Sequence, residues 1–128
     1  MKTKVYFLSM IFLLLTLRIK ADVPENVGAA IKAGNPKEIA AFFIENVDLK
    51  VIDKEMVCSR QQAEAILKNF FDKHNIKTFV ITHKGDTKNG SQYVISKMET
   101  SSGNYRVYFL IKTVSNKQMV QQFRIENE

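Results

Sequence analysis

Cysteine is almost absent from this chain of 128 residues, in which Cys58 stands alone. A single cysteine cannot form a disulfide within the chain, so packing alone must hold the fold together. The segment EMVCS, residues 55–59, indicates a small buried hydrophobe at this position rather than a nucleophile. Cys58 also lies too far along the chain to carry a lipid at a signal-peptide junction.

The patterns that usually announce chemistry are also missing. The sequence has no glycine-rich phosphate loop, no Ser-His-Asp pattern and no cluster with metal-ligand spacing. It contains no internal repeat and no low-complexity segment, and its only prolines are Pro24 and Pro36. We therefore expect no metal and no cofactor.

The first 21 residues contain no acidic residue. Lys2 and Lys4 precede an apolar run over residues 5–17, which is shorter than the roughly 20 residues of a membrane-spanning helix. This arrangement predicts a secretory signal peptide over residues 1–21, cleaved after Ala21, and a single domain over residues 22–128. The protein would then be exported, to the periplasm or outside the cell, with no further membrane segment. An uncleaved N-terminal anchor is the alternative, because Arg18 and Lys20 are unusual near a cleavage site.

The net charge of +6 and the pI near 9.5 invite a nucleic-acid interpretation. Residues 1–21, however, hold four of the 19 basic residues and none of the 13 acidic ones. The remaining chain therefore has 15 basic and 13 acidic residues, a net charge of only +2. No run of Lys and Arg is left to follow a phosphate backbone, so we expect no nucleic-acid partner.

Three helices are predicted in the first part of the domain. The first has an apolar stripe and ends at Gly34. The second begins at NPKE, residues 35–38, with Asn35 as its N-cap, and continues through IAAFF, residues 39–43. The third covers residues 59–74, opens with a capping box, and has one apolar face made of Ala63, Ile66, Leu67, Phe70 and Phe71.

The rest of the domain alternates as β-strands do, with turn segments DTKNG, SSGN and SNK between the longer runs. The predicted strands cover residues 48–53, 55–59, 76–84, 91–100, 104–114 and 117–126. The four long strands form an antiparallel meander, and the helices must cover one of its faces. The sequence therefore predicts an α+β domain with three N-terminal helices and a mostly antiparallel sheet of about six strands.

This order of elements resembles the nuclear-transport-factor-like superfamily, which includes ketosteroid isomerase and has a cystatin-like fold. The resemblance implies a strongly curved, cone-like sheet that encloses the helices. More narrowly, four segments are similar to a family of small exported Bacteroidota proteins that carry a domain of unknown function, over roughly residues 24–126. The segments are KNFFDKH, THKGDTKNG, NYRVYFLIK and QQFRIE. The resemblance transfers no catalytic residue.

Alternation along residues 104–114 indicates which sheet face meets the helices, because the odd positions are the more apolar. The same test gives the predicted inner face as Phe79, Ile81, His83, Val94, Ser96, Met98, Tyr105, Val107, Phe109, Ile111, Met119, Gln121, Phe123 and Ile125. Burying a polar side chain without a partner costs about 1–3 kcal/mol. Each polar residue on this face therefore has a partner, lies at the mouth of the cone, or lines a pocket. The pocket candidates are His83, Ser96, Tyr105, Gln121, Phe79, Phe109 and Phe123.

Two functions follow from this face. The first is a binding or interaction module with a small apolar ligand between helices and sheet. The alternative is acid–base catalysis of the ketosteroid-isomerase type, for which His83 would be the base, because no acidic residue falls on the predicted inner face. Structural explanations also remain open: His83 as a rim residue, Ser96 as a small packing residue, Tyr105 with its hydroxyl at the surface.

The outer face of the sheet has an apolar centre and a basic rim. No predicted helix remains to cover it, and such patches usually mark association. We expect a homodimer, or docking of another envelope protein, through this face, and the superfamily resemblance also implies dimers of this kind. The interface candidates are Tyr93, Ile95, Arg106, Tyr108, Leu110 and Arg124, and Val80 and Val120 are expected on the same face. A monomer whose long polar side chains cover the patch is the alternative.

Overall fold

The computed structural model describes residues 22–128 of the chain. The predicted signal peptide, residues 1–21, lies outside the described residues. The elements follow in the order α2 (Val23–Lys32), α3 (Pro36–Ala41), β1 (Phe43–Val51), β2 (Lys54–Ser59), α4 (Arg60–Lys73), β3 (Ile76–Asp86), β4 (Gln92–Thr100), β5 (Gly103–Val114) and β6 (Lys117–Asn127). Within residues 22–128, no helix is long and apolar enough to cross a membrane.

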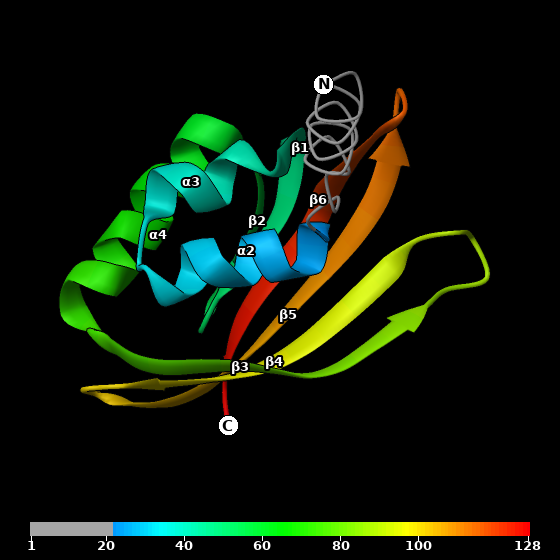
Figure 1. Cartoon of the computed structure of the whole chain (residues 1–128). Helices are drawn as coiled ribbons and strands as arrows, with labels where there is room; N and C mark the ends of the chain where they lie inside the picture. Colours follow the sequence, from blue (N-terminus) through cyan, green and yellow to red (C-terminus); the bar gives the residue numbers. More distant parts are fainter. Residues whose placement is uncertain (1–21) are drawn as a thin grey trace, which may run out of the picture.

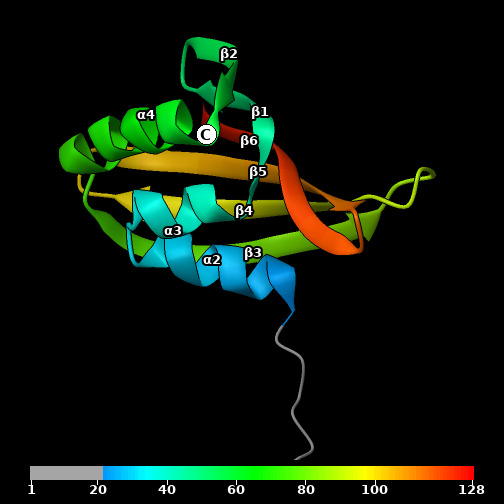
Figure 2. The ribbon, with the colours of Figure 1, turned by 90° about the horizontal axis from the view of Figure 1, so that it is seen from above.

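The strands form one six-stranded sheet in the order β2-β1-β6-β5-β4-β3. All neighbours are antiparallel except β1 and β6, which are parallel. The sheet bends around α2, α3 and α4, which lie together on its concave side (Figures 1 and 2). The predicted α+β fold, with helices on one side of a mostly antiparallel, curved sheet, is confirmed.

Side-chain caps fix where α3 and α4 begin. The Asn35 side chain accepts a hydrogen bond from the backbone N–H of Glu38, and Pro36 occupies the first turn of α3. At α4, Ser59 and Gln62 form the predicted capping box, in which each side chain accepts a bond from the other's backbone N–H. Helix α2 ends at Lys32, and Gly34, whose φ is +62°, follows its C-cap residue Ala33.

The second helix is shorter than its sequence predicts, and the first strand is longer. Helix α3 stops at Ala41, and β1 starts at Phe43, five residues before the predicted start of that strand. Phe43 is fully buried, and its ring lies 5.3 Å from that of Phe123. The carbonyl oxygen of Phe42 accepts a 2.7 Å bond from Val120 N–H. Pairing with the distant strand β6 therefore overrides the local helical pattern.

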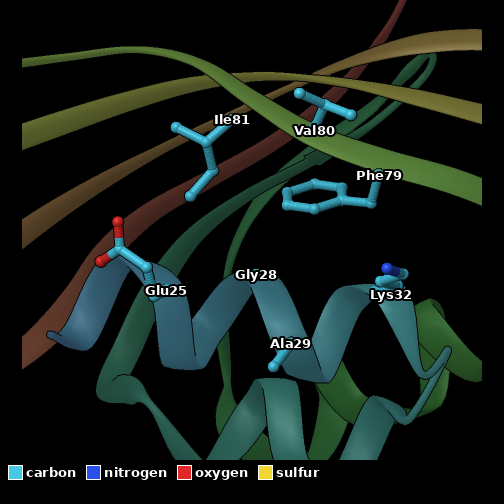
Figure 3. Close-up of a pocket in the computed structure, with 7 residues that line it drawn as sticks. All are labelled: Glu25, Gly28, Ala29, Lys32, Phe79, Val80 and Ile81. Atoms are coloured by element: carbon cyan, nitrogen blue, oxygen red, sulfur yellow. The ribbon is translucent and has the colours of Figure 1, made fainter. Parts of the chain in front are cut away.

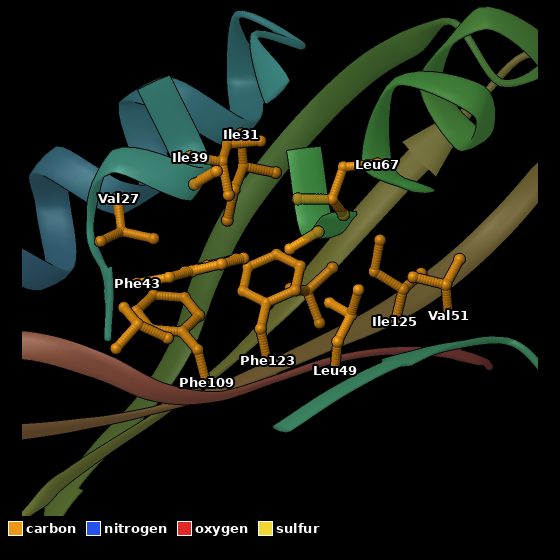
Figure 4. Packing of buried hydrophobic residues seen from close by; sticks show 14 of the residues in the cluster. Val27, Ile31, Ile39, Phe43, Leu49, Val51, Leu67, Phe109, Phe123 and Ile125 are labelled. Atoms are coloured by element: carbon orange, nitrogen blue, oxygen red, sulfur yellow. The ribbon is translucent and has the colours of Figure 1, made fainter. Parts of the chain in front are cut away.

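The core fills the space between the helices and the concave face of the sheet (Figure 4). Rings of Phe43, Phe109 and Phe123 form its centre, and each is fully buried. Val27, Ile31 and Ile39 from α2 and α3, and Leu67 from α4, complete the layer on the helix side. Val107, Phe109 and Ile111 are buried in β5, as their alternation predicts.

A β-bulge in β3 reverses which side chains face the helices. Ile81 pairs with Ser96, and His83 pairs with Ile95, so β3 advances two residues while β4 advances one. An extra residue turns all later side chains of a strand to the opposite face. His83 therefore lies on the outer face with Ile95, which corrects its predicted inward position. It is exposed to solvent.

A second bulge does the same in β6. Leu110 pairs with Gln122, whereas Ile111 pairs with Val120, so Gln121 is the extra residue. Val120 is consequently fully buried in the core, although alternation predicts it on the outer face. Met119, which alternation predicts inside, is buried, although it pairs with Lys112 on the outer side and lies outside the main core cluster.

Candidate functional site

Ser96 is a buried packing residue that satisfies its own hydroxyl group. It is fully buried on the concave face of β4. Its Oγ donates a 2.8 Å hydrogen bond to the carbonyl oxygen of Val107 on the neighbouring strand. A hydroxyl that already has a buried backbone partner has no unmet need for a ligand.

Phe109 and Phe123 likewise pack against other side chains. Their rings stack 6.2 Å apart with an angle of 19° between their planes, and both are fully buried. Figure 4 shows helix side chains reaching this layer from above. Gln121, the bulge residue of β6, is only partly buried. These candidates do not come together around one cavity.

Tyr105 belongs to an aromatic group at one end of the helix layer. Its hydroxyl oxygen lies 3.3 Å from Nδ1 of His74, and its ring packs edge-on against Phe70, 5.3 Å away. His74 stacks on Phe70 at 4.3 Å. The sequence places His74 only at the end of the third predicted helix. Its partner, Tyr105, is 31 residues away, and no local pattern links the two.

A hollow of about 270 Å³ lies beside this aromatic group, between α4 and the β1–β2 turn. It is lined by apolar residues and by polar ones, which are Val51, Ile66 and Phe70, and Asp53, Lys54, Asn69, Lys73 and His74. Ile52, which also lines it, has φ of +57°, a left-handed conformation that β-branched residues rarely adopt. The arrangement offers apolar contact and hydrogen-bond donors, and it also includes the carboxylate of Asp53.

A wider groove of about 400 Å³ runs between α2 and β3 (Figure 3). Phe79, the one pocket candidate that it contains, and Ile81 reach toward the helix. Gly28 lets the two elements approach closely, because a Cβ atom there would lie 3.1 Å from the Phe79 ring. The remaining lining residues are Glu25, Ala29, Lys32 and Val80.

An ion pair ties α2 to β3 at one end of this groove. Lys84 Nζ donates a 2.6 Å hydrogen bond to Glu25 Oε1, and Asp22 lies 3.9 Å from the same nitrogen. The hydrogen bond from Lys84 lowers the pKa of Glu25, and the bond to Glu25 raises the pKa of Lys84. Lys84 can reach α2 because the bulge before it turns its side chain to the concave side.

On the outer face, the predicted interface residues form a compact block. Tyr93 pairs with Leu110, and Ile95 pairs with Tyr108, so two residues of β4 lie beside two of β5. All four side chains are partly exposed, and no helix of the described part of the chain packs on them. We call these four residues the outer apolar cluster. Tyr93 is fixed further by its hydroxyl group, which lies 3.0 Å from Nε2 of His83.

The two arginines predicted at the rim differ in their partners. Arg106 is exposed. Arg124 instead crosses to β1 and β2, where its guanidinium lies 3.3 Å from Glu55 and 3.7 Å from Asp48. Asp48 also accepts a 2.9 Å bond from the Gln122 amide. Arg124 is thus already engaged within its own chain.

Among residues 22–128, no three His, Cys, Asp or Glu side chains converge in a way that would hold a metal ion. Cys58 is buried against the helices, and its burial raises the pKa of its thiol. The described residues therefore offer no activated thiol.

Known structures place this fold in the class of cystatin-like, nuclear-transport-factor-like α+β domains. A domain of unknown function with a cystatin-like fold from Nostoc punctiforme superimposes with a TM-score of 0.65 at 12% identity, over 81% of this chain and 72% of the other. At that identity the similarity shows the fold alone.

The chain belongs to the family described as "Domain of unknown function (DUF4783)", whose model matches residues 24–126. A DUF4783 family protein from Bacteroides uniformis is 33% identical, with a TM-score of 0.77 over 84% of this chain and 98% of that one. One from Bacteroides fragilis is 31% identical, with a TM-score of 0.76 over 84% and 100% of the two chains. A search of curated proteins finds no match.

Proposed function

We propose that this chain is an exported, non-catalytic association module whose outer sheet face binds a second copy of the same chain. The outer apolar cluster carries the proposal, since Tyr93, Ile95, Tyr108 and Leu110 form one block that no described helix covers. Two tyrosines at the centre of such a patch are typical of interfaces, because their rings give large contact areas at small entropic cost.

The charges of the outer face favour a second copy as the occupant. The outer positions of β2, β1 and β6 carry three acidic and three basic side chains, while those of β5 and β4 carry three basic and one acidic. A two-fold axis parallel to the strands places the three carboxylates of the first half in one copy over the mostly basic half of the other. The groups are Asp48, Glu55 and Glu126 with Lys50, Lys117 and Arg124, and Lys97, Arg106 and Lys112 with Glu99.

Sedimentation velocity of residues 22–128 at micromolar concentration tests the proposal. The wild-type domain is expected to sediment as a dimer, and Leu110→Lys as a monomer, because the substitution puts a charge in the centre of the contact. Thr113→Lys is the matched control, since it adds the same charge on the same strand at an exposed position outside the cluster. A wild-type monomer, or a dimer that Leu110→Lys leaves intact, overturns the proposal.

A small apolar ligand is the second candidate, and the hollow beside His74 and Tyr105 supports it. The hollow combines apolar side chains with polar groups that could orient a ligand, although about 270 Å³ is small for a ligand site. Native mass spectrometry of protein purified from the periplasm tests it. A bound mass that disappears in Ile66→Trp, which fills the hollow, supports the ligand, whereas an unchanged bound mass places it elsewhere.

The acid–base alternative loses its basis in this geometry. His83 lies on the exposed outer face, hydrogen-bonded to Tyr93, whereas Tyr105 is buried on the concave face. General acid–base catalysis requires the base within hydrogen-bonding reach of a bound substrate. We therefore do not propose catalysis at His83.

A further inference from the structure

Strand β3 is an unpaired edge of the sheet. It pairs with β4 on one side, and no other strand of residues 22–128 pairs with it on the opposite side. In an antiparallel edge strand, every second residue points its backbone N–H and C=O groups away from the sheet. Such a row of unpaired groups is a template for another extended chain.

Irregularities limit this edge to a short central window. The register of β3 shifts between Ile76 and Thr78, and again between Ile81 and His83. Bulges protect edge strands because they bend the backbone away from a straight pairing partner. Between the two shifts, Thr78, Phe79, Val80 and Ile81 pair without interruption with β4. This stretch is the regular part of the edge.

The groove between α2 and β3 runs along the same window. Phe79 and Ile81 belong to the concave side of the sheet, whereas Val80, which pairs with Lys97, belongs to the outer side. A groove lined by residues of both sides must pass along the edge itself, as Figure 3 shows for Val80 and Phe79 on either side of the β3 ribbon. Helix α2 forms the opposite wall with Gly28 and Ala29.

We propose that this groove binds an extended, acidic segment of another protein, which adds as a strand to β3 over Thr78–Ile81. Alternate apolar side chains of the segment would contact Phe79, Ile81 and Ala29, because side chains of a strand alternate between two faces. Val80, of which 57% is exposed, would be covered on the other face.

Charge decides between an acidic partner and a second copy of this chain. Lys32 lines the groove and Lys77 lies on β3 beside the window, and neither forms a salt bridge within residues 22–128. The acidic lining residue Glu25 is already paired with Lys84, so acidic side chains of a bound segment would pair with these two lysines instead. Lysines on an edge strand are a known device against self-pairing.

The probe is a synthetic peptide of about eight residues in which valine alternates with glutamate and threonine. As an extended strand it spans about 26 Å. A peptide with lysine in place of glutamate is its control. We expect the acidic peptide to slow amide hydrogen exchange in β3 and to shift the NMR signals of Gly28, Ala29 and Thr78–Ile81. The lysine peptide should bind at least about tenfold more weakly, and salt should reduce the difference.

Two substitutions on α2 separate groove binding from general effects. Ala29→Phe fills the groove from an exposed position and should abolish peptide binding, whereas Asn26→Phe adds the same ring at an exposed position outside the groove and should not. Lys32→Glu should reverse the preference between the two peptides. The same experiments in Leu110→Lys keep the result independent of the proposed dimer.

Peptide shifts on β4 and β5 outer positions instead of β3, or equal binding of both peptides, would overturn the inference. Amide hydrogen exchange in β3 that slows as the protein concentration rises, with no peptide present, would also overturn it, because the occupant of the edge would then be a second copy.

Discussion

Gly85 and Tyr93 are cross-strand partners, and the tyrosine ring lies against the glycine backbone so closely that a Cβ atom on Gly85 would overlap it. We predict that Gly85→Ala displaces the ring, breaks its hydrogen bond with His83 and lowers the free energy of unfolding by about 1–3 kcal/mol. Urea unfolding measures this loss. In a Tyr93→Ala background the same glycine substitution should cost almost nothing, because no ring remains to be displaced, and an undiminished cost there would contradict the contact.

The bulge in β6 makes opposite predictions for two adjacent residues. Val120→Lys should destabilise the domain severely, by more than about 4 kcal/mol, because Val120 is fully buried in the apolar core. Gln121→Lys should change stability by no more than about 0.5 kcal/mol. Simple alternation along the strand predicts the reverse order, so chemical denaturation of the two variants decides between the two registers.

The Glu25–Lys84 pair should give a pH dependence of defined sign. The pKa of Glu25 is lowered from its ordinary value of 4.5. The stabilisation of the fold by the ion pair is therefore present above pH 4.5 and is lost as the pH falls through the lowered pKa. The pKa of Lys84 is raised from 10.5, so on the alkaline side the contribution persists until the pH rises through that raised value. NMR titration of the Glu25 carboxyl measures the first shift.

Substitution of the lysine tests the cause of that shift. Lys84→Gln should return the Glu25 pKa toward 4.5, because its hydrogen-bonded cation is gone. Lys32→Gln, on the same helix as Glu25, should leave it unchanged. A Glu25 pKa that stays low in Lys84→Gln would show that another group is responsible.

Cys58 should be unreactive in the native protein. Only 3% of its surface is exposed, and burial raises the pKa of the thiol from 9.0, so thiolate is scarce at neutral pH. An aromatic disulfide reagent should label it quantitatively in denaturant but only at the rate of opening in native buffer. Rapid labelling of the native protein would contradict the described burial.

Features governed by neighbouring residues could be predicted from the sequence. The caps at Asn35 and Ser59 depend on contacts three residues apart, and the alternation of β5 is uninterrupted, so both were identified correctly. The family resemblance extended these local patterns to the curvature of the sheet.

Features governed by strand pairing could not be predicted from the sequence. No residue pattern within β3 or β6 marks the bulges, which arise where each strand meets its neighbour. One extra residue in β3 turns His83 away from the helix side of the sheet, and one in β6 turns Val120 toward it. The contact of Tyr105 with His74 also requires the tertiary fold, because the two residues belong to separate elements.

The position of β6 determines when this domain can fold. The last strand of the chain lies between β1 and β5, near the middle of the sheet, and supplies Phe123 and Ile125 to the core. A growing chain that lacks these residues has two half-sheets with nothing to join them. Folding of the whole sheet must therefore wait until β6 has been synthesised.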